Sequence, residues 1–168
     1  MQKLEFLVLH CTATPKGRMV TKEDIIRWHT SPVSEGGRGW KQVGYSDMIY
    51  LDGTLVNLVP HNEDAYVDSW EITNGASGIN SRSRHVVYAG GMDENNKKPE
   101  DTRTEKQKEA MATLVKHFIE MHPTIKVLGH YQAPDTGGKA CPSFDVPIWL
   151  RSIGVPEVNI YSKVATRN

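Results

Sequence analysis

The sequence predicts an α/β fold: a single domain with a mixed central β-sheet and helices packed on its faces. Short apolar runs that suit strands alternate along the chain with segments of helical periodicity. The chain has 168 residues, the length of one domain, and it contains no repeat, low-complexity tract or internal linker. We expect the domain to cover residues 1–154 and a C-terminal tail to follow at residues 155–168.

The first half of the chain predicts a strand, a helix and a hairpin. Residues 4–9 are apolar enough for a strand that is buried on both faces. Thr21 is placed to cap a helix because acidic residues follow it in the first turn. The apolar contacts of this helix are expected from Ile25, Ile26 and Trp28. Asp52-Gly53 lies between two apolar runs in residues 45–59 and favours a hairpin, since both residues tolerate positive φ.

The second half of the chain predicts two further strands that alternate with two helices. Residues 85–89 and 125–128 are apolar runs typical of strands. Thr104 and Gln107 have the spacing of a capping box at the start of a helix. The apolar face of that helix is expected to contain Met111, Leu114, Val115, Phe118 and Ile119. A last helix is expected to begin near Asp145 and to pack inward through Ile148, Trp149 and Leu150.

Charge and hydropathy exclude several classes of partner. Lys plus Arg number 20, as do Asp plus Glu, so no global field favours nucleic acid or an anionic membrane. No stretch approaches the roughly 20 apolar residues that insertion across a bilayer requires. The N-terminal apolar run is short and contains Glu5, so we expect no signal peptide. These features predict a monomer made in the cytoplasm, which would act outside it only after release or export.

Two of the seven histidines, His10 and His130, stand at the ends of apolar strands. A strand end is rigid and opens toward loops, so it can direct an imidazole into a cleft. Together with Cys141 they would make a three-ligand zinc set with an open fourth position. The spacing alone leaves two alternatives, because Cys141 could be a small buried residue or could form a disulfide with Cys11.

The other five histidines carry weaker signals. His29 and His117 fall within predicted helices, and His122 falls at a helix C-terminus, where the dipole favours a cation. For these three a surface or capping role is favoured over metal ligation. The spacing of His61 and His85 does not distinguish between roles.

Five segments, in order along residues 6–150, resemble the type 2 N-acetylmuramoyl-L-alanine amidases. This family includes small phage amidases and shares its fold with the peptidoglycan recognition proteins. The matching segments read LHCTAT at 9–14, GWKQVGY at 39–45 with LDGT at 51–54, GINSRS at 78–83 with AGG at 89–91, GH at 129–130, and KACPSFD at 139–145. Five ordered motifs are far more specific than any one of them.

The resemblance implies a zinc ion held by His10, His130 and Cys141, with Tyr45 and Lys139 as catalytic residues. Without it, Tyr45 would be interpreted as an aromatic residue packed on the sheet and Lys139 as a solvated loop charge. The family hydrolyses the amide bond between N-acetylmuramic acid and L-alanine in peptidoglycan. The resemblance therefore implies an amidase domain at residues 1–154 that acts on peptidoglycan or muropeptides in the cell wall.

The chain departs from the family pattern at three places. Ser46 and Gly75 stand where some phage members have histidine, and the loop between His130 and Lys139 is longer than in the short phage enzymes. All three changes border the expected cleft. They bear on substrate detail rather than on the metal ligands.

Two other functions remain open at this level. The first is a non-catalytic peptidoglycan-binding module, but recognition relatives without activity commonly lack the cysteine ligand, so Cys141 favours an enzyme. The second is a regulatory partner of another protein, which no residue specifically supports. Arg38 and Trp40, with the polar segment at residues 61–84, could line a groove for sugar or peptide.

Overall fold

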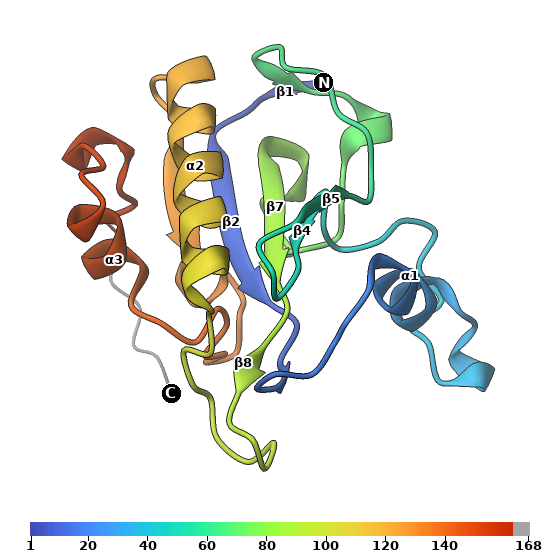
Figure 1. Ribbon diagram of the computed structural model, residues 1–168. Helices are drawn as coiled ribbons and strands as arrows, with labels where there is room; N and C mark the ends of the chain where they lie inside the picture. The colour runs from blue at the N-terminus through green and yellow to red at the C-terminus, as the bar shows by residue number, and fades with distance from the viewer. Residues whose placement is uncertain (163–168) are drawn as a thin grey trace.

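A computed structural model describes residues 1–162, and its centre is a five-stranded mixed sheet (Figure 1). The strands lie in the order β5 (Leu55–Asn57), β4 (Asp47–Ile49), β7 (Ser83–Tyr88), β2 (Phe6–Cys11) and β9 (Lys126–Gly129). The neighbouring pairs β4–β7, β7–β2 and β2–β9 are parallel, and β5 is antiparallel to β4. The predicted α/β class with a mixed sheet is confirmed.

Within the described residues, helices cover both faces of this sheet. The α2 helix (Glu105–Met121) lies across one face with α3 (Val146–Ser152) beside it, and α1 (Lys22–Thr30) packs near β4 on the other face through Ile25 (Figure 1). Side chains alternate along β2, so Leu7 and Leu9 join the core beneath α2 while His10 faces the other way. On that second face Met48 and Val87 pack against Ile25 of α1, whereas Val8 and Leu128 pack against residues of two loops, Ala76, Ile79 and Ala133.

Two small sheets extend the fold beyond the central one. The β1 strand (Gln2–Lys3) pairs antiparallel with β6 (Tyr66–Val67), and β3 (Thr14–Pro15) pairs parallel with β8 (Gly91–Met92). The polar segment at residues 61–84 contains β6, two 3₁₀ turns and the first two residues of β7. Its backbone hydrogen bonds tie it to the N-terminus of the chain.

Local sequence signals predicted the starts of the helices correctly. Thr21 caps α1 and accepts a hydrogen bond from the backbone N–H of Asp24. Thr104 and Gln107 form the predicted capping box of α2. The hairpin turn also agrees, since Gly53 has a φ of 85°. The first strand begins and ends two residues later than predicted, because the N–H of Leu4 bonds to the carbonyl of Ala65 outside the central sheet.

The inward faces of the two short helices were predicted correctly only in part. Ile25 and Leu150 are buried, and Trp28 and Trp149 pack against the core, as expected, but two isoleucines face outward. Ile26 of α1 is 39% exposed and Ile148 of α3 is 64% exposed. In α3 the buried residues are Val146 and Leu150, which are four positions apart and so share a face. In α1 the same spacing buries Ile25 together with His29, so His29 is not a surface residue.

Residues 155–162 pack against the edge of the sheet. Ile160 is buried and forms a bridge with Val127 of β9, and the ring of Tyr161 contacts that of Phe6 edge-on. The rest of the predicted tail, residues 163–168, lies outside the described residues. No helix in the described part of the chain is long and apolar enough to cross a membrane.

Candidate metal centre

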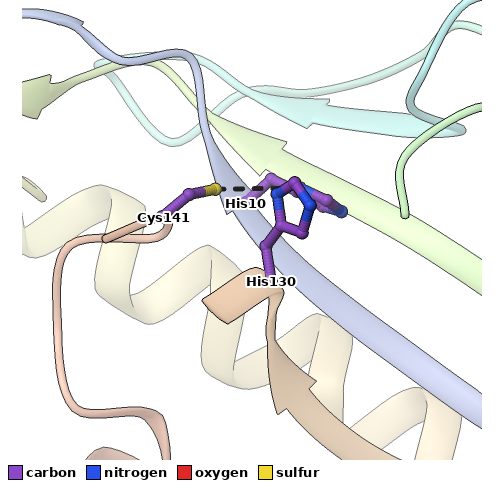
Figure 2. A group of neighbouring side chains, drawn as sticks. All are labelled: His10, His130 and Cys141. Carbon is purple, nitrogen blue, oxygen red and sulfur yellow. Dashed lines mark hydrogen bonds between the residues drawn. The ribbon is translucent and has the colours of Figure 1, made fainter. Parts of the chain in front are cut away.

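The three residues expected to bind metal come together at one edge of the sheet. His10 lies near the end of β2, His130 directly follows β9, and Cys141 lies in the loop before α3 (Figure 2). Because β2 and β9 are parallel neighbours, their carboxyl ends meet at the same edge. One potential ligand atom from each of the three residues lies within 4.8 Å of the other two.

The spacing of these donors suits a tetrahedral zinc ion. Usual zinc–nitrogen and zinc–sulfur bond lengths place tetrahedral N and S ligands ~3.6 Å apart. The Nδ1 atom of His10 lies 3.7 Å from the Sγ atom of Cys141. Two imidazoles and one thiolate are a ligand set that zinc accepts, and three protein ligands leave one coordination position free. The residues present therefore fit a zinc ion.

The two histidines are held in the neutral form that a metal ligand requires. Burial, reinforced by the nearby His130, holds the pKa of His10 well below its usual value. Burial, together with the charge of Lys139, lowers the pKa of His130 to about 4. The opposite nitrogen of His10, Nε2, lies 2.9 Å from Nδ1 of His85.

The loop that carries Cys141 is anchored by hydrogen bonds on both sides of the sulfur. The N–H of Tyr131 donates to the carbonyl of Cys141 at 2.9 Å, and the hydroxyl of Tyr88 donates to the carbonyl of Pro142 at 2.6 Å. The N–H of Cys11 donates to Sγ of Cys141 at 3.2 Å. Burial raises the pKa of the Cys141 thiol, and a bound cation would reverse this effect by favouring the thiolate.

Both cysteines, which lie in the described part of the chain, are free thiols. The sulfur of Cys11 is 3.7 Å from the hydroxyl of Ser143. The disulfide that the sequence left open is therefore absent from these described residues, and Cys141 is available to a metal.

Tyr45 and Lys139 line the same cleft of about 430 Å³ as His130 and Cys141. The ring of Tyr45 lies 5.0 Å from that of His10, centroid to centroid. Burial raises the pKa of Tyr45, so its phenol stays protonated at neutral pH. Tyr45 comes from the loop before β4, His130 from the end of β9, and Lys139 and Cys141 from the loop before α3, so three distant segments converge here.

His29 belongs to the wall of this cleft, contrary to the expectation of a surface or capping role. Its Nδ1 atom accepts a hydrogen bond from the N–H of Gly44 at 2.9 Å, and its ring packs against Trp40 and Tyr45. Burial, with a smaller contribution from Arg38, lowers its pKa to about 4. The spacing of Ile25 and His29 along α1 was the sequence signal that could have placed it inward.

The remaining histidines lie away from the three candidate metal ligands, except for His85. His61 pairs with Asp47 at 3.1 Å, and this hydrogen bond raises its pKa. His117 is exposed and His122 caps the C-terminus of α2, which confirms the expectation for both. His85 is completely buried beside His10, a placement that its spacing in the sequence did not indicate.

Fold and site together define a small α/β protein with a cleft at the carboxyl end of a mixed sheet, beside a His-His-Cys group that could bind a metal. The family model for N-acetylmuramoyl-L-alanine amidase matches residues 1–144. This chain therefore belongs to the N-acetylmuramoyl-L-alanine amidase family, and the resemblance seen in the motifs is confirmed.

Known proteins of similar sequence and structure agree with this assignment. The endolysin of Klebsiella phage KP32 is 30% identical over 148 residues, which cover 88% of this chain and 86% of that protein. The amidase LysC from Clostridium intestinale shares the fold with a TM-score of 0.66 at 20% identity, covering 92% of this chain and 88% of its own. The bumblebee recognition protein PGRP-SA also has a TM-score of 0.66, at 16% identity, with 98% of this chain and 87% of its own covered.

Proposed function

We propose that this chain is a zinc-dependent enzyme that hydrolyses the amide bond between N-acetylmuramic acid and L-alanine in peptidoglycan. The observation that carries the proposal is the convergence of two neutral imidazoles and a thiol beside a cleft that Tyr45 and Lys139 also line. Three ligands and an open fourth position are typical of catalytic zinc sites rather than structural ones.

Lys139 is suited to stabilise charge that develops on the carbonyl oxygen of the scissile amide. When bound, zinc supplies Lewis-acid activation of the carbonyl and of the attacking water. Lys139 lines the cleft close enough to His130 to lower the pKa of that histidine. An ammonium group in this position favours the transition state over the neutral amide. Loss of one such donor typically costs about 2.7–4 kcal/mol.

Tyr45 is suited to hold and transfer a proton in the same cleft. Its phenol is protonated at neutral pH because burial raises its pKa. The leaving amine must gain a proton when the amide bond breaks, and a positioned hydroxyl can donate it or can orient the attacking water. In this proposal Tyr45 does the proton transfer and Lys139 the charge stabilisation, while His10, His130 and Cys141 hold the metal.

Arg38 and Trp40 are suited to bind the substrate beside the reacting amide. The guanidinium of Arg38 lies 5.0 Å from the centroid of the Trp40 ring. Both residues line a hollow of about 220 Å³ that shares His29, Tyr45 and Lys139 with the main cleft. A flat indole can stack on a sugar, and a guanidinium can pair with a carboxylate of the stem peptide.

The similarity to phage endolysins supports a role in lysis of the bacterial cell wall. The fold shared with PGRP-SA raises binding without catalysis as the other candidate. Cys141 favours the enzyme, because a module that only binds peptidoglycan has no use for a third metal ligand beside Tyr45 and Lys139.

Digestion of purified peptidoglycan by the zinc-loaded protein tests this function. New N-terminal alanine is expected, and the Cys141→Ser variant serves as the matched control that should release little. New reducing sugar ends would identify a glycosidase instead. Binding to peptidoglycan without any release of alanine would establish the recognition module and overturn the proposal.

A further inference from the structure

His85 lies against the metal ligand His10 inside the protein. The register of the parallel strands pairs Val8 with His85 and His10 with Val87, so the two histidines are diagonal neighbours on one face of the sheet. Both side chains are buried, at 1% exposure for His10 and 0% for His85. Nε2 of His10 is 2.9 Å from Nδ1 of His85, whereas Nδ1 of His10 is directed to Cys141.

This arrangement determines where the protons of both rings must lie when a metal is bound. A nitrogen that binds a cation carries no proton, so Nδ1 of His10 as a ligand requires a proton on Nε2. That N–H points at Nδ1 of His85, which must accept it. The proton of His85 is then on its own Nε2, which is buried and has no hydrogen-bond partner among residues 1–162. This unsatisfied group is the cost of holding the ring here.

Two departures from the family pattern meet at His85. Gly75 has no side chain where some phage amidases have histidine, and a Cβ atom there would lie 2.4 Å from both Cγ and Nδ1 of His85. The carbonyl of Gly44 would be 2.7 Å away, so nothing larger than glycine fits. The His85 ring therefore occupies the space beside His10 that a side chain at position 75 would need.

Ser46, the second departure, holds the backbone of His85. Its N–H donates to the carbonyl of His85 at 2.9 Å, and its hydroxyl lies 2.9 Å from the same carbonyl and 3.0 Å from Oδ2 of Asp47, either of which can accept its proton. Because Ser46 directly precedes β4, only a short side chain at this position can reach the carbonyl of His85. Ser46 thus holds the backbone of His85, and Gly75 leaves space for its buried ring.

We infer that His85 is a positioning residue for the metal site: it accepts the Nε2 proton of His10 and so holds Nδ1 of His10 toward the cation. Groups that hydrogen-bond to a ligand histidine orient its ring and set its tautomer, and their loss typically lowers metal affinity 10- to 100-fold. The inference rests on the proposed zinc site. His85 does not line the cleft described above, so it acts through His10 alone.

Two substitutions distinguish the role of His85 as a hydrogen-bond acceptor from its role in filling space. His85→Leu fills much of the space without an acceptor. His85→Asn places its Oδ1 atom where Nδ1 of histidine lies. Zinc affinity is measured by competition with a chromogenic chelator, and the ligand field by absorption of the cobalt-substituted protein. His117→Leu, at an exposed histidine of α2, is the matched control, and thermal unfolding of the metal-free variants reports their folding.

The expected result is a zinc affinity about 10- to 100-fold lower for His85→Leu, with His85→Asn close to wild type and His117→Leu unchanged. Equal losses in the Leu and Asn variants, or no loss in either, would overturn the inference. If the wild-type chain itself bound no zinc, the proposed function would fail first, so the two failures can be told apart.

NMR of the zinc-loaded wild type gives a test that does not depend on folded variants. Long-range ¹⁵N–¹H spectra of the imidazoles report which ring nitrogen carries the proton. Protons on Nε2 of both His10 and His85 are expected. A proton on Nδ1 of His85 would show that it does not accept from His10, and the inference would be wrong.

Discussion

The Nδ1 atom of His10 lies 3.7 Å from the sulfur of Cys141, although 131 positions separate the two residues in the chain. His10 reaches this point on a central strand, and Cys141 on a loop tied to Tyr88 and Tyr131. The pair is thus held by rigid structure on both sides.

Cys141→Ser should remove most of the zinc from the purified protein. The wild-type chain is expected to contain about one zinc per chain, because its three ligands form a single site. A serine hydroxyl is not deprotonated as readily as a thiol and is a weaker ligand for zinc. Metal analysis after dialysis measures the effect, and Cys11→Ser is the control that should keep more zinc. Full zinc retention in Cys141→Ser would refute the ligand assignment.

Tyr45→Phe and Lys139→Ala should keep zinc and lose turnover. Lys139→Ala removes a donor to the developing charge and is expected to lower kcat by ~10²–10³. Tyr45→Phe removes the proton donor and is expected to lower it by ~10²–10⁴. Release of N-terminal alanine measures the rate, and metal analysis confirms occupancy. Undiminished turnover in either variant would exclude that residue from the mechanism.

Combined replacement of Arg38 and Trp40 by alanine should weaken substrate binding more than it slows the chemical step. Both residues line the hollow beside the cleft, and neither is a candidate metal ligand or one of the two proposed catalytic residues. We expect KM for soluble muropeptides to rise while kcat changes little, the pattern of lost uniform binding. An unchanged KM would show that these two side chains do not contact the substrate.

The stability of the metal-free protein should fall as the pH drops from about 6.5 toward 4, in part through His29. Burial lowers the pKa of His29 from 6.5 to about 4, so the unfolded chain binds its proton more readily than the folded one. The contribution of His29 to the free energy of unfolding is fully present above pH 6.5. It decreases as the pH falls toward 4, by up to ~1.4 kcal/mol per pH unit. Urea unfolding at pH 7 and 5 measures the slope. His29→Asn should flatten it relative to wild type, and an identical slope would contradict the assignment.

Leu150→Ala and Ile148→Ala should differ strongly although both lie in α3. Leu150 is completely buried, and its loss is expected to cost about 2–5 kcal/mol. Ile148 is 64% exposed, and its replacement should stay within about 0.5 kcal/mol. Denaturant unfolding compares the two. Equal losses would mean that α3 presents a different face to the core.

Features that depend on neighbours in the sequence were predictable. Thr21 and Thr104 begin their helices because a capping side chain bonds to a backbone N–H three residues away. The hairpin forms at Asp52-Gly53 because glycine accepts a positive φ there. The candidate ligands were found through motifs, since a histidine at a strand end and a cysteine in a loop have no local signature of their own.

Tertiary structure alone decided which surfaces face inward and which distant groups touch. Ile148 is exposed and His29 is buried because the sheet and neighbouring loops, rather than hydrophobicity, select the face of a short helix. His85 reaches His10 through the register of two parallel strands, and it fits there because Gly75, on a separate loop, has no side chain. By itself the sequence determined the caps, the turn and the family motifs, which are local. Contacts between residues far apart in the chain depend on how the strands align, so only the folded structure determined the surroundings of the candidate metal site.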